Sequence, residues 1–220
     1  MVEPETFSTV VPFWEHLSEQ DKKELASISS IQSYGAGACI HNADQACIGV
    51  FFVLSGFARA YMLSEEGREI TLFRVEKHES CVLSASCVLP LVTFDILVVA
   101  SEKAELLVMP ADYYSKLLER NVAVEAYTYK QATIRFSEVM WVMQQQVFMG
   151  LDRRLAIFLL DEIDRTGEAR INATHEEIAR NIGSAREAVS RMLKTFADKG
   201  LVELFRGGVV VLDKRGLREL

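Results

Sequence analysis

Hydrophobic and polar positions change their period along the chain, and each period predicts a different kind of element. Between Phe7 and Ser29 the apolar residues recur at helical spacing, which predicts one or two short helices with a start marked by Ser18 and Asp21. Residues 31–110 carry short apolar runs separated by turn signals, which predicts strands at 49–54, 57–63, 70–73, 94–100 and 104–109. Strands this short and this closely spaced favour a small barrel or jelly roll.

A helical region is predicted from Ala111 to Gly150. From about Val122 it carries two apolar stripes, formed by Phe136, Met140, Met143 and Val147 and by Ile134, Trp141 and Phe148. A helix with two apolar stripes must bury two faces, so we expect one face on the barrel and the other on the same helix of a second copy. The alternative is one broad core face in a monomer.

The last part of the chain reads as helices followed by a hairpin. Gly150-Leu151-Asp152 is the expected hinge, before a helix at 153–165 and a short strand at Ile171. A hairpin is predicted around Arg206-Gly207-Gly208, with strands at 201–204 and 209–212 and a helical tail at 213–220. The pattern thus predicts three parts: residues 1–120, 121–150 and 151–220.

The stretch from Thr174 to Leu201 reads as two short helices joined by a tight turn at Gly183. Thr174 is expected to cap the first helix, with Glu177 completing a capping box. Ser184 is expected to cap the second helix, again with an acid, Glu187, three residues later. Apolar residues at helical spacing form the inner faces, so this is a helix-turn-helix pattern.

The outward face of the second helix carries side chains that can read base edges. They are Arg186, Glu187, Ser190, Arg191 and Lys194. Arginine pairs with guanine, glutamate with cytosine and serine with either in a major groove. Thr174 and Arg206, the latter at the tip of the hairpin and facing phosphate, complete the candidate DNA contacts. The alternative is a solvated helix face without a ligand.

The run T-H-E-E-I-A-R-N-I-G-S-A-R-E-A-V-S-R-M-L resembles the C-terminal winged helix of the Crp–Fnr regulators, the family of the cyclic-AMP receptor protein. Arg186, Glu187 and Arg191 match the family's base-reading triplet, and Ser190 matches the serine of its oxygen-sensing branch. The resemblance implies an α+β chain with an N-terminal double-stranded β-helix barrel, a long dimerisation helix and a winged helix-turn-helix. It implies a transcription factor whose partners are double-stranded DNA, a second copy, RNA polymerase and an effector that is not identified.

Composition and charge fit a two-domain protein whose DNA contact is local. The chain has 220 residues and a formal charge of −7; through Gly150 there are 11 Lys and Arg against 19 Asp and Glu, and after it 13 against 12. Phosphate contact must therefore come from a patch, formed by Arg180, Arg186, Arg191, Lys194, Arg206 and Lys214. No apolar run is long enough to span a bilayer, and Met1 to Phe13 lacks a basic leader region, so we expect a soluble cytoplasmic protein with no membrane partner.

The signal is not evident from the residues. The stretch from Ser80 to Leu89 lacks the Gly-Glu-Leu turn and the Arg-Ser pair of the cyclic-nucleotide branch, and no Arg lies between Arg74 and Lys103. Val139 and Met140 stand where that branch has Thr-Ser. A phosphate without a nearby cation is poorly held, which argues against cyclic AMP. The cofactor stays unknown.

Four cysteines are the candidates for a redox input: Cys39, Cys47, Cys81 and Cys87. An iron–sulfur cluster would need all four to converge without a close Cys-x-x-Cys, and no zinc spacing is present, so we assign no metal site. Thiol sensing through Cys81 and Cys87, an apolar ligand in the barrel, and buried structural thiols stay open.

Two rival functions follow from the same fold. A metal-dependent enzyme of cupin type would need a His/His/Glu set, which four scattered histidines, at 16, 41, 78 and 175, do not supply. A cyclic-nucleotide-binding regulatory protein would leave the helix-turn-helix without a role. We therefore expect a regulator and no enzyme activity.

Overall fold

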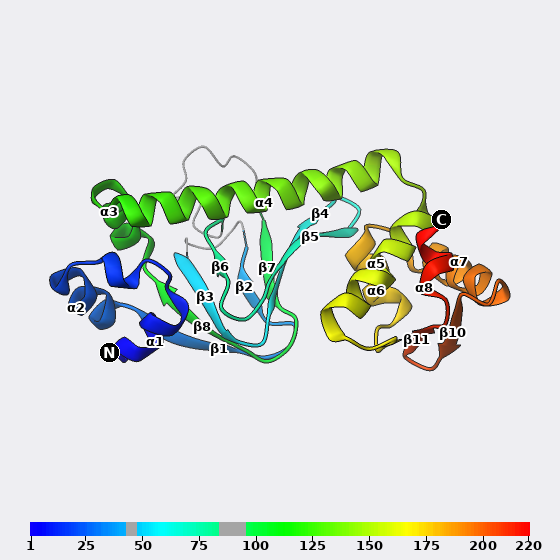
Figure 1. Ribbon diagram of the computed structural model, residues 1–220, viewed down its shortest axis with the longest axis horizontal. Coiled ribbons are helices and arrows are strands. Elements are labelled where there is room, and N and C mark those ends of the chain that lie inside the picture. The colour runs from blue at the N-terminus through cyan, green and yellow to red at the C-terminus, as the bar shows by residue number, and fades with distance from the viewer. Residues whose placement is uncertain (43–47, 84–95) are drawn as a thin grey trace. The chain divides into compact units, whose positions relative to one another are not determined.

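The computed structural model describes residues 1–42, 48–83 and 96–220 (Figure 1). The chain forms two compact units. One comprises Met1–Met62 and Leu72–Val139, and the other comprises Leu63–Thr71 and Met140–Leu220.

The first unit begins with short helices, α1 (Pro4–Val10), η1 (Trp14–His16) and α2 (Glu19–Ile28). Ser18 caps α2 as predicted, because its hydroxyl accepts from the Asp21 amide at 3.1 Å. Phe7 stacks on Trp14 with ring centroids 4.6 Å apart, and both rings are buried. These helices therefore contribute aromatic side chains to the core of the unit.

The strands form two four-stranded sheets. One has the order β1 (Ser30–Tyr34), β8 (Ala104–Met109), β3 (Val50–Ser55), β6 (Ser80–Cys81), and the other the order β2 (Cys39–His41), β7 (Leu97–Ala100), β4 (Ala58–Leu63), β5 (Glu69–Val75). The predicted strands at 57–63 and 70–73 are confirmed as β4 and β5, which are neighbours, and in the turn between them the Gly67 amide donates to the Ser64 carbonyl at 2.9 Å. The predicted strand at 94–100 begins at Leu97, and its residues 94–95 lie outside the described ranges.

Both sheets share one hydrophobic core, to which α1, α2 and the helices after β8 also contribute. Gly56 makes the turn from β3 to β4 with a φ of 70°, and a Cβ atom there would lie 2.4 Å from the Lys103 carbonyl oxygen. Only glycine fits this position. The sheet-rich region between residues 31 and 110 is thus confirmed as an antiparallel two-sheet body.

The helical region after the sheets consists of α3 (Ala111–Arg120) and α4 (Val122–Phe148). The expectation that one of the two apolar stripes of α4 packs on the barrel is wrong. Every residue of both stripes is exposed, from 40% for Ile134 to 80% for Phe148. The buried positions are Val124, Thr128 and Arg135, a third row that the apolar pattern hid because two of the three are polar.

The second unit contains the last helices and a three-stranded sheet. Its elements are α5 (Leu151–Thr166), β9 (Arg170–Ile171), α6 (His175–Ile182), α7 (Arg186–Asp198), β10 (Val202–Phe205), β11 (Gly208–Val211) and α8 (Lys214–Arg218). Helix α5 begins at Leu151 with Gly150 as its N-cap, so the expected hinge residues Leu151 and Asp152 are helical. The sheet order β10-β11-β9 confirms the predicted hairpin and places β9 beside it.

Candidate nucleic-acid interface

Helices α6 and α7 form the predicted helix-turn-helix. The capping box at Thr174 is confirmed: the Glu177 amide donates to Thr174 Oγ1 at 3.2 Å, and the Thr174 amide donates to Glu177 Oε2 at 2.7 Å. Gly183 ends α6 in the left-handed conformation with a φ of 63°. The Ser184 amide then donates to the Ala179 carbonyl at 3.0 Å, which closes the turn.

The predicted cap of the second helix is wrong. The N-cap of α7 is Ala185, with no side-chain hydrogen bond, and the Ser184 amide is already engaged by Ala179. The extended φ and ψ of −84° and 142° fall on Ala185 because the turn after Gly183 is one residue longer than the pattern indicated. The carboxylate of Glu187 is therefore not held back by a capping bond.

The inner faces of the two helices are buried together. Ile178 and Ile182 of α6 and Val189, Leu193 and Phe196 of α7 all belong to the core of this unit. The core also includes apolar residues of α5 and of the three-stranded sheet, and this fixes the orientation of α7. The predicted burial of the apolar inner faces is confirmed.

A polar contact holds the C-terminal end of α6. Gln146 Nε2 and Arg154 Nη1 donate to the Ile182 carbonyl at 2.9 and 2.8 Å, and Arg154 also bonds the Gln146 side chain. Burial lowers the pKa of the Arg154 guanidinium from its ordinary value. These two side chains satisfy a carbonyl that α6 leaves open at its end, and the sequence patterns did not reveal this role.

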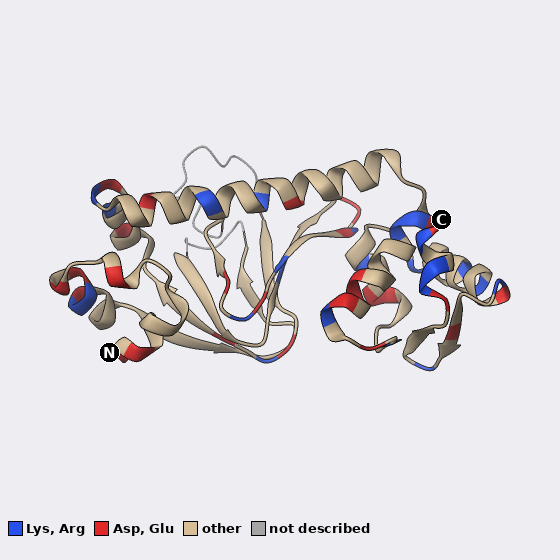
Figure 2. Ribbon diagram, viewed as in Figure 1, with Lys and Arg blue, Asp and Glu red and all other residues tan. Residues whose placement is uncertain are grey.

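The outward face of α7 has basic and polar side chains available for a ligand. Arg186, Glu187, Arg191 and Lys194 are exposed, and Ser190 is half-buried. The ribbon of the second unit carries both basic and acidic positions (Figure 2). Within the described residues, no acidic group lies within ion-pair distance of Arg186, Arg191 or Lys194. Arg180 differs, since its Nε lies 3.6 Å from Glu176 Oε1. These three α7 side chains are therefore available to pair with an external anion.

The hairpin of β10 and β11 forms the wing. Arg206 and Gly207 make its turn, and Arg206 is exposed. The Arg170 guanidinium lies 3.7 Å from the centroid of the Phe205 ring, so a β9 side chain fixes the base of the turn. At Gly208 a Cβ atom would lie 2.3 Å from both the Ile171 carbonyl oxygen and the Phe205 ring, which restricts this position to glycine.

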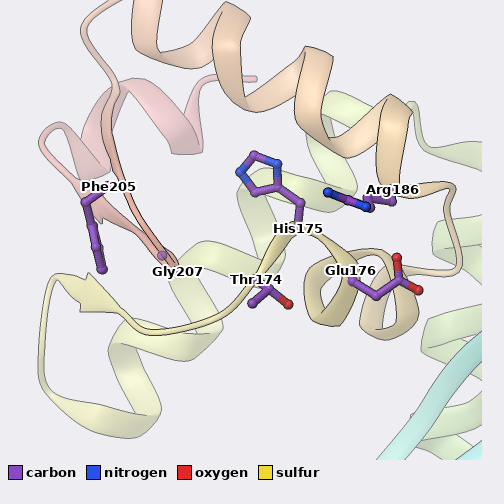
Figure 3. Close-up of a pocket in the computed structure, with 7 residues that line it drawn as sticks. Thr174, His175, Glu176, Arg186, Phe205 and Gly207 are labelled. Atoms are coloured by element: carbon purple, nitrogen blue, oxygen red, sulfur yellow. The ribbon is translucent and has the colours of Figure 1, made fainter.

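A cavity of about 440 Å³ opens between the helix-turn-helix and the wing (Figure 3). Thr174 and Arg186, two of the sequence-predicted DNA contacts, line it together with His175, Glu176, Phe205, Gly207 and Gly208. Glu187, Ser190, Arg191, Lys194 and Arg206 do not line it. The structure therefore brings the starts of α6 and α7 and the wing turn to one place, and adds His175, which the sequence patterns did not single out.

The candidate effector residues are only partly described. Cys39 is exposed in β2, and Cys81 is buried in β6 opposite Phe51. Cys47, Cys87 and residues 84–89 lie outside the described ranges. Among the residues that the structure does describe, no group of three or more His, Cys, Asp and Glu could hold a metal ion, and no helix is long and apolar enough to cross a membrane.

A buried arginine of α4 contacts the backbone of Arg74 and Ser80, although the sequence between Arg74 and Lys103 contains no Arg. Arg135 of α4 is 2% exposed, and its guanidinium donates to the Arg74 and Ser80 carbonyls at 3.1 and 3.3 Å. Glu79 and Glu138 lie 3.1 and 2.9 Å from its terminal nitrogens. The sequence between Arg74 and Lys103 does not contain this cation because a helix far along the chain supplies it.

The chain is similar to known regulators over most of its length. Residues 153–220 match the family model of the Crp-like helix-turn-helix domain, and residues 31–121 match that of the cyclic nucleotide-binding domain. A solved chain from Eubacterium rectale, described as a transcriptional regulator of the Crp/Fnr family, is 38% identical, with a TM-score of 0.91 and coverage of 96% of this chain and 98% of that one.

Two further relatives are regulators. The HTH-type transcriptional regulator Cmr of Mycobacterium tuberculosis is 22% identical over 92% of this chain and 80% of its own length. The transcriptional regulator SdrP of Thermus thermophilus is 35% identical over 77 residues, which are 32% of this chain and 38% of SdrP. Proteins of this kind regulate transcription and are not enzymes, which decides against the cupin-type alternative. The chain belongs to the Crp/Fnr family of transcriptional regulators.

Proposed function

We propose that this protein is a homodimer that reads a palindromic operator through α7, under the control of a small-molecule or redox signal sensed by its N-terminal unit. The observation that carries the proposal is the outward face of α7. It presents Arg186, Glu187 and Arg191 on a helix fixed by a buried core, without an internal ion pair for either arginine among the described residues. Such a helix lies in a major groove with its first residues on base edges.

The dimer rests on the exposed faces of α4. Seven apolar residues of the two stripes are at least 40% exposed, which is unusual for so many large side chains on one helix. Between the stripes runs a row of small or polar residues, also exposed, at intervals of seven and four: Ala126, Thr133, Ser137 and Gln144. These intervals are those of a coiled-coil seam, in which small residues allow close approach and the flanking stripes cover the contact. Members of the family are typically dimers.

One reader helix in each of two symmetric chains recognises two half-sites one helical turn apart, roughly 34 Å centre to centre. Selection of tight-binding duplexes from a random pool tests this directly. We expect an inverted repeat with that spacing, bound by two chains. Insertion of about five base pairs between the half-sites should abolish tight binding, because it rotates one half-site to the opposite side of the duplex. A protein that stays monomeric on its selected duplex contradicts the proposal.

Cys39 and Cys81 are the two cysteines whose surroundings bear on a redox form of the signal. Exposed Cys39 and buried Cys81 differ in access, and Cys81 lies next to Ser80, whose hydroxyl is 2.8 Å from that of Tyr127 on α4. Oxidation of Cys81 could therefore reach α4, the helix that we assign to the dimer contact, through the contact between Ser80 and Tyr127. If oxidised and reduced protein bind the operator equally, the redox form of the signal is excluded; if Cys81→Ser or Cys87→Ser removes a difference, it is supported.

The site of action follows from the proposed function. A regulator that binds operators works beside the chromosome and RNA polymerase, which in a bacterium means the cytoplasm.

A further inference from the structure

The C-terminal end of α6 is held by two side chains that also hold each other. Gln146 Nε2 and Arg154 Nη1 donate to the Ile182 carbonyl at 2.9 and 2.8 Å, and Arg154 Nη1 also donates to Gln146 Oε1. We refer to these three residues as the α6 clamp. They come from the end of α4, the first turn of α5 and the last residue of α6, and all of them lie in the second compact unit.

The α6 clamp lies directly before the turn that leads to the reader helix. Ile182 is followed by Gly183, which has a left-handed φ of 63°, and α7 begins at Arg186. A Cβ atom at Gly183 would lie 3.2 Å from Gln146 Nε2, so the Gln146 side chain also packs against the turn. The first turn of α7 has no side-chain cap, and the buried residues of α7 begin only at Val189. The placement of this first turn therefore depends on the contacts that hold the turn before it.

Stability alone does not account for the arginine in the α6 clamp. The Arg154 Nε atom is buried and, among the residues that the structure describes, has no hydrogen-bond partner. The same residues place no carboxylate within ion-pair distance of its guanidinium. A buried donor without a partner and a half-buried charge without a counter-ion both destabilise the folded state. A methionine of similar length would avoid both costs, so what Arg154 contributes is the placement of the Ile182 carbonyl.

We infer that the α6 clamp places the first turn of α7 for base reading, so that Gln146 and Arg154 are positioning residues for sequence recognition. The inference rests on the proposed function and adds to it two residues that lie outside the helix-turn-helix. Contacts to base edges are short and directional and need an accurately placed helix, whereas phosphate contacts from long basic side chains tolerate displacement. A looser clamp should therefore weaken binding to the operator more than binding to scrambled DNA.

The experiment uses the full chain with its selected operator and a scrambled duplex. Arg154→Met and Gln146→Met each remove one donor from the Ile182 carbonyl and keep a side chain of similar length. Arg153→Met and Gln145→Met are the matched controls, because each changes the neighbouring residue of the same type. We expect each clamp variant to lower the ratio of operator affinity to scrambled affinity about tenfold, as the loss of a base contact would. The midpoint of thermal unfolding should stay unchanged, and the controls should keep the ratio of the unaltered chain.

Two further measurements separate a clamp from two independent side chains. Because each donor is held in place by the other, the double variant should lose no more specificity than a single variant does. The Ser184 amide donates to the Ala179 carbonyl at 3.0 Å inside the turn, and its hydrogen should exchange faster in every clamp variant.

Equal ratios in the clamp variants and the unaltered chain would overturn the inference, as would additive losses in the double variant or an unchanged exchange rate at Ser184. A lower thermal midpoint with equal losses on both duplexes would also overturn it, because that result would show a purely structural role. Failure of the unaltered protein to select any duplex would instead refute the proposed function, so the two failures are distinguishable.

Discussion

At the scale of single residues, the two candidate helix caps behave differently. Thr174 exchanges two hydrogen bonds with Glu177, whereas Ser184 makes no capping bond and the N-cap of α7 is Ala185. Thr174→Ala should therefore lower the free energy of unfolding by about 1 kcal/mol, and Ser184→Ala should change it by less than about 0.5 kcal/mol. Urea titration of both variants checks this. Equal losses would mean that Ser184 does cap α7.

The α7 side chains should separate from the wing in their effect on specificity. Arg191→Ala and Glu187→Ala each remove a candidate base contact, which costs about 1–3 kcal/mol on the operator and little on scrambled DNA. The freedom of Glu187 from a capping bond strengthens this expectation. Arg206→Ala should weaken binding to both duplexes alike and lower the salt slope by about one. Titrations over a salt series decide; if Arg191→Ala weakens both duplexes equally, α7 is not the reader.

At the scale of elements, the sequence predicts what local chemistry decides. Gly183 and the Arg206-Gly207 turn end elements where expected, because a positive φ or a tight turn needs a particular residue type. Gly150 shows the limit: a glycine suited to a hinge instead caps α5. Helix boundaries depend on contacts with residues that are close in space, and the local sequence does not show these contacts.

The faces of α4 show why the rest was not predictable. Hydrophobicity alone favoured one of the two apolar stripes for the barrel, yet the buried row contains Thr128 and Arg135. Thr128 is 0% exposed and satisfied by Tyr114 Oη and the Val124 carbonyl, and the terminal nitrogens of Arg135 contact two carboxylates and two carbonyls. Tyr114 on α3 and Arg74, Glu79 and Ser80 in the strand region are partners from outside α4, so the polarity of Thr128 and Arg135 misled the assignment. His175 was missed for a related reason, since its cavity is formed by three elements that meet only in the fold.

At the scale of the whole molecule, the exposed faces of α4 should determine how tightly DNA is bound. Phe136→Glu combined with Met143→Glu puts charges on one stripe, at side chains that are 66% and 56% exposed and so contribute little to the folded monomer. We expect this variant to sediment as a monomer that is still folded, as shown by a cooperative thermal unfolding transition. Leu212→Glu, at an apolar residue that is 58% exposed outside α4, is the matched control and should remain a dimer.

The same variant separates dimerisation from base reading. Two linked readers bind with the second site at high effective concentration, which strengthens binding by a factor on the order of 100 or more over one reader alone. The monomeric variant should therefore lose at least that factor on the palindrome but bind an isolated half-site as well as the unaltered chain does. Equal affinity of variant and unaltered protein for the palindrome would show that α4 is not the dimer contact. Loss of half-site binding as well would show that the charges disturb the DNA-binding unit itself.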